Sequence, residues 1–306
     1  MSRLSPHAIL PTTDEQQAGP GRFPEPEPGG GRHGPLHAHP HHRFPTTVHP
    51  PRQGHFAKEF ALAASIQAKL FPAFLPELAG CELAARYRPA FLCGGDYYDV
   101  LALSDDQKHG HYLLCVADVS GKGLPASLLM SSLQATLRTF VVYRPPLTEL
   151  VVRTNALLHA RIPADRFITA ILVDFEPDSG RCRFVNAGHN GGVLVRSDGM
   201  VEVLASTGPP LGMLESLAFS AESVVLRAGD VLSLYSDGVT EAFNPFEEEW
   251  GLERLLGCLS QWRHSKPETI ITRVFEEIDS FAGKAPQHDD ITILVLKRLG
   301  LPSPAP

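Results

Sequence analysis

The 306-residue sequence contains no apolar run that approaches the roughly 20 residues a membrane-spanning helix needs. Its N-terminus also lacks the apolar core of a secretory signal peptide. We therefore expect a cytoplasmic protein without membrane contact. The residues are 43% hydrophobic and 20% charged, which is typical of globular proteins, and the length allows one large domain or two ordinary ones.

Cysteine is scarce, and its spacing excludes two kinds of scaffold. The five cysteines are dispersed, odd in number and without a CxxC pair, which argues against a disulfide framework or a zinc site. Cys93 lies three residues before Asp96 and could bind a metal. Because cysteine is usually buried, a thiol in the core is the preferred interpretation.

Several catalytic and binding signatures are also missing. We find no P-loop, no GxSxG elbow and no Cys/His dyad. Residues 1–54 carry five Arg against four Asp and Glu, so the remaining 252 residues hold 22 Lys and Arg against 30 Asp and Glu, a balance of −8. An acidic domain without a basic stripe repels phosphate backbones, which disfavours nucleic-acid binding.

The N-terminal segment is rich in residues that oppose a packed core. Residues 1–54 contain 11 Pro, 7 Gly and 7 His and almost no apolar periodicity, which predicts a disordered tail. The stretch at 37–42 (HAHPHH) could chelate a transition metal, but incidental affinity of a low-complexity tail is the simpler interpretation.

A helix is predicted over residues 55–71, within a linker or regulatory segment at 55–76. Apolar residues recur there at intervals of three and four, and Pro72 and Pro76 end the pattern. The apolar residues are Phe56, Phe60, Ala63, Ile66 and Leu70. Such a stripe packs on its own domain, which is the default expectation, or pairs with a regulator or a second copy.

The remainder, residues 77–300, alternates pairs of strands with helical blocks. Strands are predicted at 82–88, 97–103, 111–117, 167–175, 181–187, 192–196, 222–227, 230–236 and 291–298. Helices are predicted at 123–142, 147–160, 251–263 and 267–282. Adjacent strand pairs favour antiparallel sheets with helices outside, an α+β fold.

Four acidic segments flank predicted strands and carry the chemistry. Asp118 and Asp237 follow apolar strands, Asp96 precedes one, and the pair Asp289–Asp290 opens the last strand. Each alone reads as a turn or cap residue. Together, converging carboxylates are what Mg²⁺ or Mn²⁺ require, and the exposed carbonyl of Val119 could add an oxygen ligand. The set predicts a metal-dependent hydrolase.

The Gly94-Gly95-Asp96 segment has a competing interpretation. Gly-Gly-Asp also begins the GGDEF motif of diguanylate cyclases, but Tyr97 and Tyr98 replace the Glu and Phe, and nucleotide-binding features are missing.

The ordered motifs resemble a known family. They are GGDYYD (94–99), DVSGKG (118–123), NAGHN (186–190), GPPLG (208–212), YSDGVTEA (235–242) and DDIT (289–292). Over about residues 55–300 the chain resembles the SpoIIE/RsbU-like branch of the PPM (protein phosphatase 2C-type) Ser/Thr phosphatases. The resemblance implies a four-layer αββα sandwich, two Mn²⁺ or Mg²⁺ ions, and a linker helix at 55–71 that receives regulatory input.

The resemblance also implies a ligand set. Asp118 would bridge the two ions with the Val119 carbonyl beside it, Asp237 and Asp289 would hold the first ion, and Asp96 the second. Asp289 is preferred to Asp290, although either carboxylate could serve. Asp99, Glu241 and His189 are expected to be structural or to support the ligands.

The implied chemistry is direct attack on phosphoserine or phosphothreonine by a water that the two cations activate. The implied substrate is a phosphorylated anti-sigma-factor antagonist of the STAS type in bacterial partner switching. Two alternatives are a non-catalytic interaction module of the same fold and a small-molecule phosphomonoesterase.

The chain departs from the family pattern at two places. Val119 and Ser120 follow Asp118 where eukaryotic relatives have His, which leaves the leaving-group acid and the phosphate clamp unassigned. Gly191-Gly192 replaces a common Pro-Pro, which we expect to alter only a turn.

Overall fold

The structure, a computed structural model, describes residues 53–103 and 110–299. The chain divides into two units, Met1–Pro50 and Pro51–Pro306, and the described residues belong to the second. The predicted tail, including 37–42, lies outside the described residues except for its last two positions. Gln53 and Gly54 belong to the first helix, which therefore begins two residues earlier than expected.

Ten strands form two five-stranded antiparallel sheets in the described part of the chain. One sheet has the order β1-β10-β9-β6-β7 and the other β2-β3-β4-β5-β8. The strands are β1 (Cys81–Arg88), β2 (Tyr97–Ala102), β3 (Tyr112–Val119), β4 (Ile168–Glu176), β5 (Arg181–Ala187), β6 (Gly192–Val195), β7 (Val201–Leu204), β8 (Glu222–Val225), β9 (Val231–Tyr235) and β10 (Ile291–Arg298).

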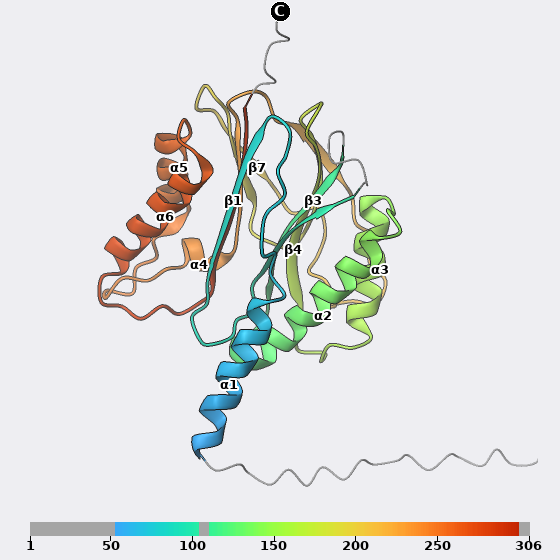
Figure 1. The fold of residues 1–306 in the computed structure, drawn as a ribbon, viewed down its shortest axis with the longest axis vertical. Coiled ribbons are helices and arrows are strands. Elements are labelled where there is room, and N and C mark those ends of the chain that lie inside the picture. The colour runs from blue at the N-terminus through green and yellow to red at the C-terminus, as the bar shows by residue number, and fades with distance from the viewer. Residues whose placement is uncertain (1–52, 104–109, 300–306) are drawn as a thin grey trace, which may run out of the picture. The chain divides into compact units, whose positions relative to one another are not determined.

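Helices cover the outer face of each sheet (Figure 1). Helices α2 and α3 pack on the β2–β8 sheet, and α5 and α6 pack on the β1–β7 sheet. The helices are α1 (Gln53–Ala68), α2 (Gly123–Val141), α3 (Leu147–His159), α4 (Asp237–Thr240), α5 (Gly251–Trp262) and α6 (Pro267–Ala282). The predicted four-layer αββα sandwich is confirmed. None of the described helices combines the length and apolarity needed to cross a bilayer.

Strand β3 shows why its sequence is apolar throughout. Leu113 and Cys115 face the α2–α3 layer, whereas Leu114 and Val116 face the other sheet. Since successive side chains alternate between the two faces, a strand buried on both sides loses the usual polar alternation. The five cysteines are free thiols and four are buried. Cys93 is 2% exposed, which fits the expected core thiol.

Two short elements were not predicted. Strand β7 and helix α4 each have four residues, too few to show a period.

The default expectation for helix α1 is met only in part: Leu70 of the predicted stripe packs against the core cluster beneath α2 and α3, whereas the stripe is more exposed elsewhere. Phe56 and Ile66 of the predicted stripe are 41% and 56% exposed, so they do not pack on the described domain. Contact is confined to the C-terminal end. The Gln67 side chain exchanges hydrogen bonds with Gly94, and the rings of Phe71 and Tyr87 stack with centroids 4.7 Å apart.

Candidate metal centre

Antiparallel pairing brings the acidic segments to one end of the sandwich. In the β2–β8 sheet, Tyr97 at the start of β2 pairs with Ala117 near the end of β3. Asp96 immediately precedes Tyr97, and Asp118 immediately follows Ala117. Two carboxylates separated by 22 positions therefore lie beside each other because one strand ends where its neighbour begins.

The other sheet repeats this arrangement. Ile293 of β10 pairs with Tyr235 at the end of β9. Asp237 opens helix α4 just beyond β9, and Asp289 lies just before β10. Because the two sheets face each other across a shared core, the four acidic segments meet.

Three of the predicted ligands line one cleft of about 220 Å³. Asp118, Asp237 and Asp289 share it with the predicted carbonyl donor, Val119. The remaining described residues of this cleft are Ser120, Gly121, Lys122, Phe167, Thr169, His189 and Asn190. Sequence reasoning had not selected Lys122, Thr169 or Asn190. Lys122 lies inside the DVSGKG motif, which was the available signal.

The fourth predicted ligand, Asp96, lies beneath this cleft and is 1% exposed. Its Oδ2 accepts hydrogen bonds from the hydroxyls of Ser236 at 2.6 Å and Thr292 at 2.5 Å. These two donors come from the opposite sheet, so Asp96 joins the two halves of the sandwich. Burial and the neighbouring Asp118 raise the pKa of Asp96 well above its ordinary range.

The two adjacent aspartates have different surroundings. Asp290 is 5% exposed and accepts backbone N–H groups of Ala90 at 2.8 Å and Gly95 at 2.7 Å. It therefore holds the glycine loop in place. The Asp289 side chain is 29% exposed and faces the cleft. This difference favours Asp289 as the ligand, in line with the preference drawn from the sequence.

Glycines permit the close approach of these loops. A Cβ on Gly238 would lie 2.0 Å from the carbonyl oxygen of Asp290, and one on Gly95 would lie 2.9 Å from that of Val119. Both contacts are with backbone atoms, which cannot move aside like a flexible side chain. The Asp237-Gly238 and Gly94-Gly95 sequences are thus required by packing around the cleft.

The acidic cluster is electrostatically strained in the absence of a cation. Burial, followed by repulsion from Asp237, Asp289 and Asp290, raises the pKa of Asp118 to about 7. Burial, followed by Asp289 and Glu241, raises the pKa of Asp237 to about 6. In addition, Asp237 Oδ1 is buried without a hydrogen-bond partner. A divalent cation would satisfy this oxygen and offset the repulsion.

Of the described residues lining the cleft, Lys122 alone carries a permanent positive charge. Its Nζ lies 2.6 Å from Asp289 Oδ2 and donates to the backbone carbonyl of His288 at 2.5 Å. Beyond it, the guanidinium of Arg166 donates to the carbonyl of Ser120 at 3.0 Å.

His189 is 6% exposed and connects the two sheets. Its Nε2 lies 3.0 Å from the carbonyl of Tyr235 in β9, which can only accept, so Nε2 carries the proton. Its Nδ1 then accepts from the hydroxyl of Thr169 in β4 at 2.7 Å. Burial lowers the pKa of His189 to about 4, so the ring is neutral. These contacts support the expected structural role.

The other two residues assigned supporting roles lie outside this cleft. Asp99 is fully buried, accepts from the Arg138 guanidinium at 2.9 and 3.1 Å, and contacts the Tyr97 hydroxyl. Glu241 is exposed just beyond α4.

The donor chemistry fits hard divalent cations, although the side chains are not yet arranged as a closed ligand shell. Within the described ranges, no three His, Cys, Asp or Glu side chains are placed to hold one ion as they stand. Lys122 occupies an oxygen of Asp289, and two hydroxyls occupy Asp96. A cation bound at Asp289 Oδ2 would compete with the Lys122 ammonium for that oxygen.

Sequence comparison assigns most of the chain to one family. The pattern of the family described as Stage II sporulation protein E (SpoIIE) matches residues 108–299. The chain is 27% identical over 267 residues to protein IcfG of Synechocystis sp., covering 78% of this chain and 41% of that protein. It is 25% identical over 249 residues to phosphoserine phosphatase RsbU of Bacillus subtilis, covering 80% of this chain and 72% of RsbU. The chain thus spans less than half the length of IcfG.

Solved structures share the fold. The SiaA-PP2C domain of Pseudomonas aeruginosa superposes with a TM-score of 0.70 at 20% identity, covering 80% of this chain and 98% of that domain. The catalytic domain of serine threonine protein phosphatase PstP, in complex with two manganese ions, has a TM-score of 0.52 at 18% identity, covering 72% and 99%. The family match and the shared fold show that this chain belongs to the SpoIIE family, in the SpoIIE/RsbU-like branch of the PPM (protein phosphatase 2C-type) phosphatases.

Proposed function

We propose that this protein is a Mn²⁺- or Mg²⁺-dependent protein phosphoserine/phosphothreonine phosphatase. The observation that carries the proposal is the cleft in which Asp118, Asp237 and Asp289 converge, with a buried Asp237 oxygen lacking a partner. The similarity to RsbU, named a phosphoserine phosphatase, supports the same conclusion.

In this proposal the carboxylates are divided between two ions, the number bound by PstP. Asp118 would contribute to both ions with the Val119 carbonyl as a further oxygen donor, Asp237 and Asp289 would hold the first ion, and Asp96 would hold the second. When bound, such a pair of cations activates water and neutralises charge on the phosphoryl oxygens.

The protein's own residues position these groups. Asp290 fixes the glycine loop that carries Asp96, and His189 fixes the end of β9 that leads to Asp237. Lys122 would supply positive charge for the substrate phosphate from the described cleft if a metal ion replaced its ammonium at Asp289.

The test is phosphate release from a phosphoserine peptide and from p-nitrophenyl phosphate, with Mn²⁺ or with EDTA. Asp118→Asn and Asp237→Asn should abolish the Mn²⁺-dependent rate. Asp198→Asn, an exposed change in the β6–β7 turn, is the matched control and should retain it. Full activity in both cleft variants would refute the assignment. Absence of activity and of Mn²⁺ binding in the wild type would indicate a non-catalytic module.

For the physiological substrate we propose a phosphorylated STAS-type anti-sigma-factor antagonist in the cytoplasm. The similarity to RsbU and to a Mycobacterium tuberculosis structure described as RsbU and RsbW domains of Rv1364c supports a partner-switching context. Faster turnover of sugar phosphates than of the phosphorylated STAS protein would instead indicate a small-molecule phosphomonoesterase.

Helix α1 is proposed as the contact with a second copy or a regulator. Phe56, Leu62 and Ile66 are 41%, 61% and 56% exposed, which leaves an apolar surface uncovered. Sedimentation of the Leu62→Glu, Ile66→Glu double variant tests homodimerisation. These changes spare Gln67 and Phe71, which contact the domain. Identical sedimentation of variant and wild type would exclude an α1-mediated dimer.

A further inference from the structure

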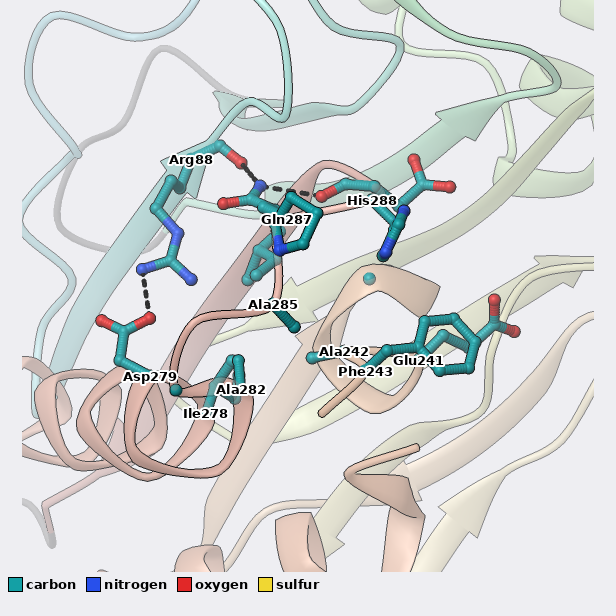
Figure 2. A pocket seen from close by; sticks show the side chains of 15 residues that line it. Arg88, Glu241, Ala242, Phe243, Ile278, Asp279, Ala282, Ala285, Gln287 and His288 are labelled. Carbon is teal, nitrogen blue, oxygen red and sulfur yellow. Dashed lines mark hydrogen bonds and ion pairs between the residues drawn. The ribbon is translucent and has the colours of Figure 1, made fainter. Parts of the chain in front are cut away.

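A second cavity, of about 320 Å³, adjoins the acidic cleft (Figure 2). This cavity is a groove bounded by three segments. They are α4 together with the residues that follow it, the C-terminal end of α6, and the loop that leads to β10. Asp289 lines both this groove and the acidic cleft, and Gly238 of the groove directly follows Asp237 of the cleft. The two spaces are therefore neighbours with Asp289 between them.

The groove has an apolar floor and a polar rim. Ile278 and Ile291 are buried beneath it, and Ala242, Ala282 and Ala285 keep it open because their side chains are small. An extended chain that crosses such a surface can place an apolar side chain against it.

Hydrogen bonds fix the rim. The Gln287 side-chain amide donates to the backbone carbonyls of Arg88 at 2.9 Å and Asp289 at 2.7 Å, and Figure 2 shows the bond to Arg88. The Arg88 guanidinium is ion-paired with Asp279 at 2.7 Å, so these two charges offset each other. The groove is thus held in shape beside Asp289 without a bound partner.

The remaining charge of the groove is acidic. Glu241 projects from the residues after α4, away from Arg88 and Asp279 in Figure 2. Glu249 lies close enough to interact with it electrostatically. A chain that follows this groove away from the cleft would meet Glu241, which favours a basic side chain over an acidic one.

We propose that this groove binds the substrate chain next to its phosphorylated residue, with an apolar side chain over Ile278, Ala282 and Ala285 and a basic side chain facing Glu241. The inference rests on the proposed phosphatase function. The position of the groove next to Asp289 favours a peptide, because a phosphoserine seated over the carboxylates places its flanking residues over one of the neighbouring surfaces. A free phosphomonoester has no such extension.

The experiment fills the groove and compares two substrates. Ala282→Phe and, separately, Ala285→Phe should lower kcat/KM about tenfold for phosphoserine peptides with Leu and Lys beside the phosphoserine. Hydrolysis of p-nitrophenyl phosphate should stay unchanged, because that compound has no flanking chain. Ala135→Phe, at an exposed position of α2, is the matched control. Thermal unfolding verifies that each variant is folded.

The proposed contact between a basic substrate side chain and Glu241 is tested separately. Wild type should prefer a flanking Lys to a flanking Glu, and Glu241→Gln should reduce that ratio of peptide kcat/KM values, which is compared between the two peptides within each variant. Unchanged peptide kcat/KM in both filled variants, or equal losses for peptide and p-nitrophenyl phosphate, would overturn the groove assignment. Inactivity of the wild type on both substrates would instead refute the phosphatase function.

Discussion

Replacing Asp118 by Asn should stabilise the protein when no metal is bound. The pKa of Asp118 is raised from 3.8 to about 7, mainly by burial and then by Asp237, Asp289 and Asp290. At 1.36 kcal/mol per unit, keeping this carboxylate ionised at pH 8 costs at most about 4 kcal/mol of folding free energy. The neighbouring acids titrate together, and the Asn amide keeps some desolvation cost, so we expect a gain of about 1–3 kcal/mol.

The sign of the pH dependence follows from the raised pKa. Stability from Asp118 is fully present below its unfolded pKa, near 3.8, and is lost as pH rises through about 7. The advantage of Asp118→Asn should therefore be less than half as large at pH 5 as at pH 8. For a domain of this size it corresponds to a rise in Tm of roughly 2–4 °C per kcal/mol.

The assay is thermal unfolding in EDTA at pH 5 and pH 8, with Asp198→Asn as the control. Saturating Mn²⁺ should reverse the order, because ligand at a thousandfold excess over Kd adds about 4.1 kcal/mol to the wild type and little to the variant. The reasoning is refuted if Asp118→Asn is no more stable than wild type in EDTA at pH 8. An advantage of equal size at both pH values would refute it as well.

Three further changes test the packing around the cleft. Gly238→Ala places a Cβ 2.0 Å from the carbonyl of Asp290, so denaturant unfolding should show a loss of about 1–3 kcal/mol and calorimetry a weaker affinity for Mn²⁺. Arg138→Leu leaves the buried Asp99 carboxylate without its ion-pair partner; because the Arg138 side chain is 43% exposed, we expect about 2–4 kcal/mol of destabilisation, with Mn²⁺ affinity retained. Burial lowers the pKa of His189 to about 4, so its neutral ring should make the protein less stable by up to about 3 kcal/mol as the pH falls from 6.5 to 4. In EDTA, the free energy of unfolding of His189→Gln should lack this part of the pH dependence.

The sequence predicted the fold well because both sheets carry strong local signals. Apolar runs such as that of β3 indicated buried strands, and the periodicity of α5 and α6 indicated helices that cover a sheet. Among the described elements, the four-residue β7 and α4 were not predicted. The periodicity of α1 correctly indicated a helix, but a period cannot tell whether the domain covers the apolar face, and Phe56 and Ile66 are exposed.

The sequence predicted which residues form the site better than it predicted how their side chains contact one another. Turn-flanked aspartates at strand ends pointed to one acidic cluster, and antiparallel pairing explains why they meet. The sequence could not reveal that Asp290 anchors Gly95, because that hydrogen bond joins residues 195 positions apart. It also could not show that Lys122 pairs with Asp289 across 167 positions, or that a second groove begins at Asp289.

The most direct test of the account is anomalous diffraction at the manganese edge from crystals grown with Mn²⁺. We predict two manganese peaks in the cleft, both within ligand distance of Asp118, with Asp237 and Asp289 on the first ion and Asp96 on the second. A cleft without manganese, or manganese bound away from these carboxylates, would contradict it.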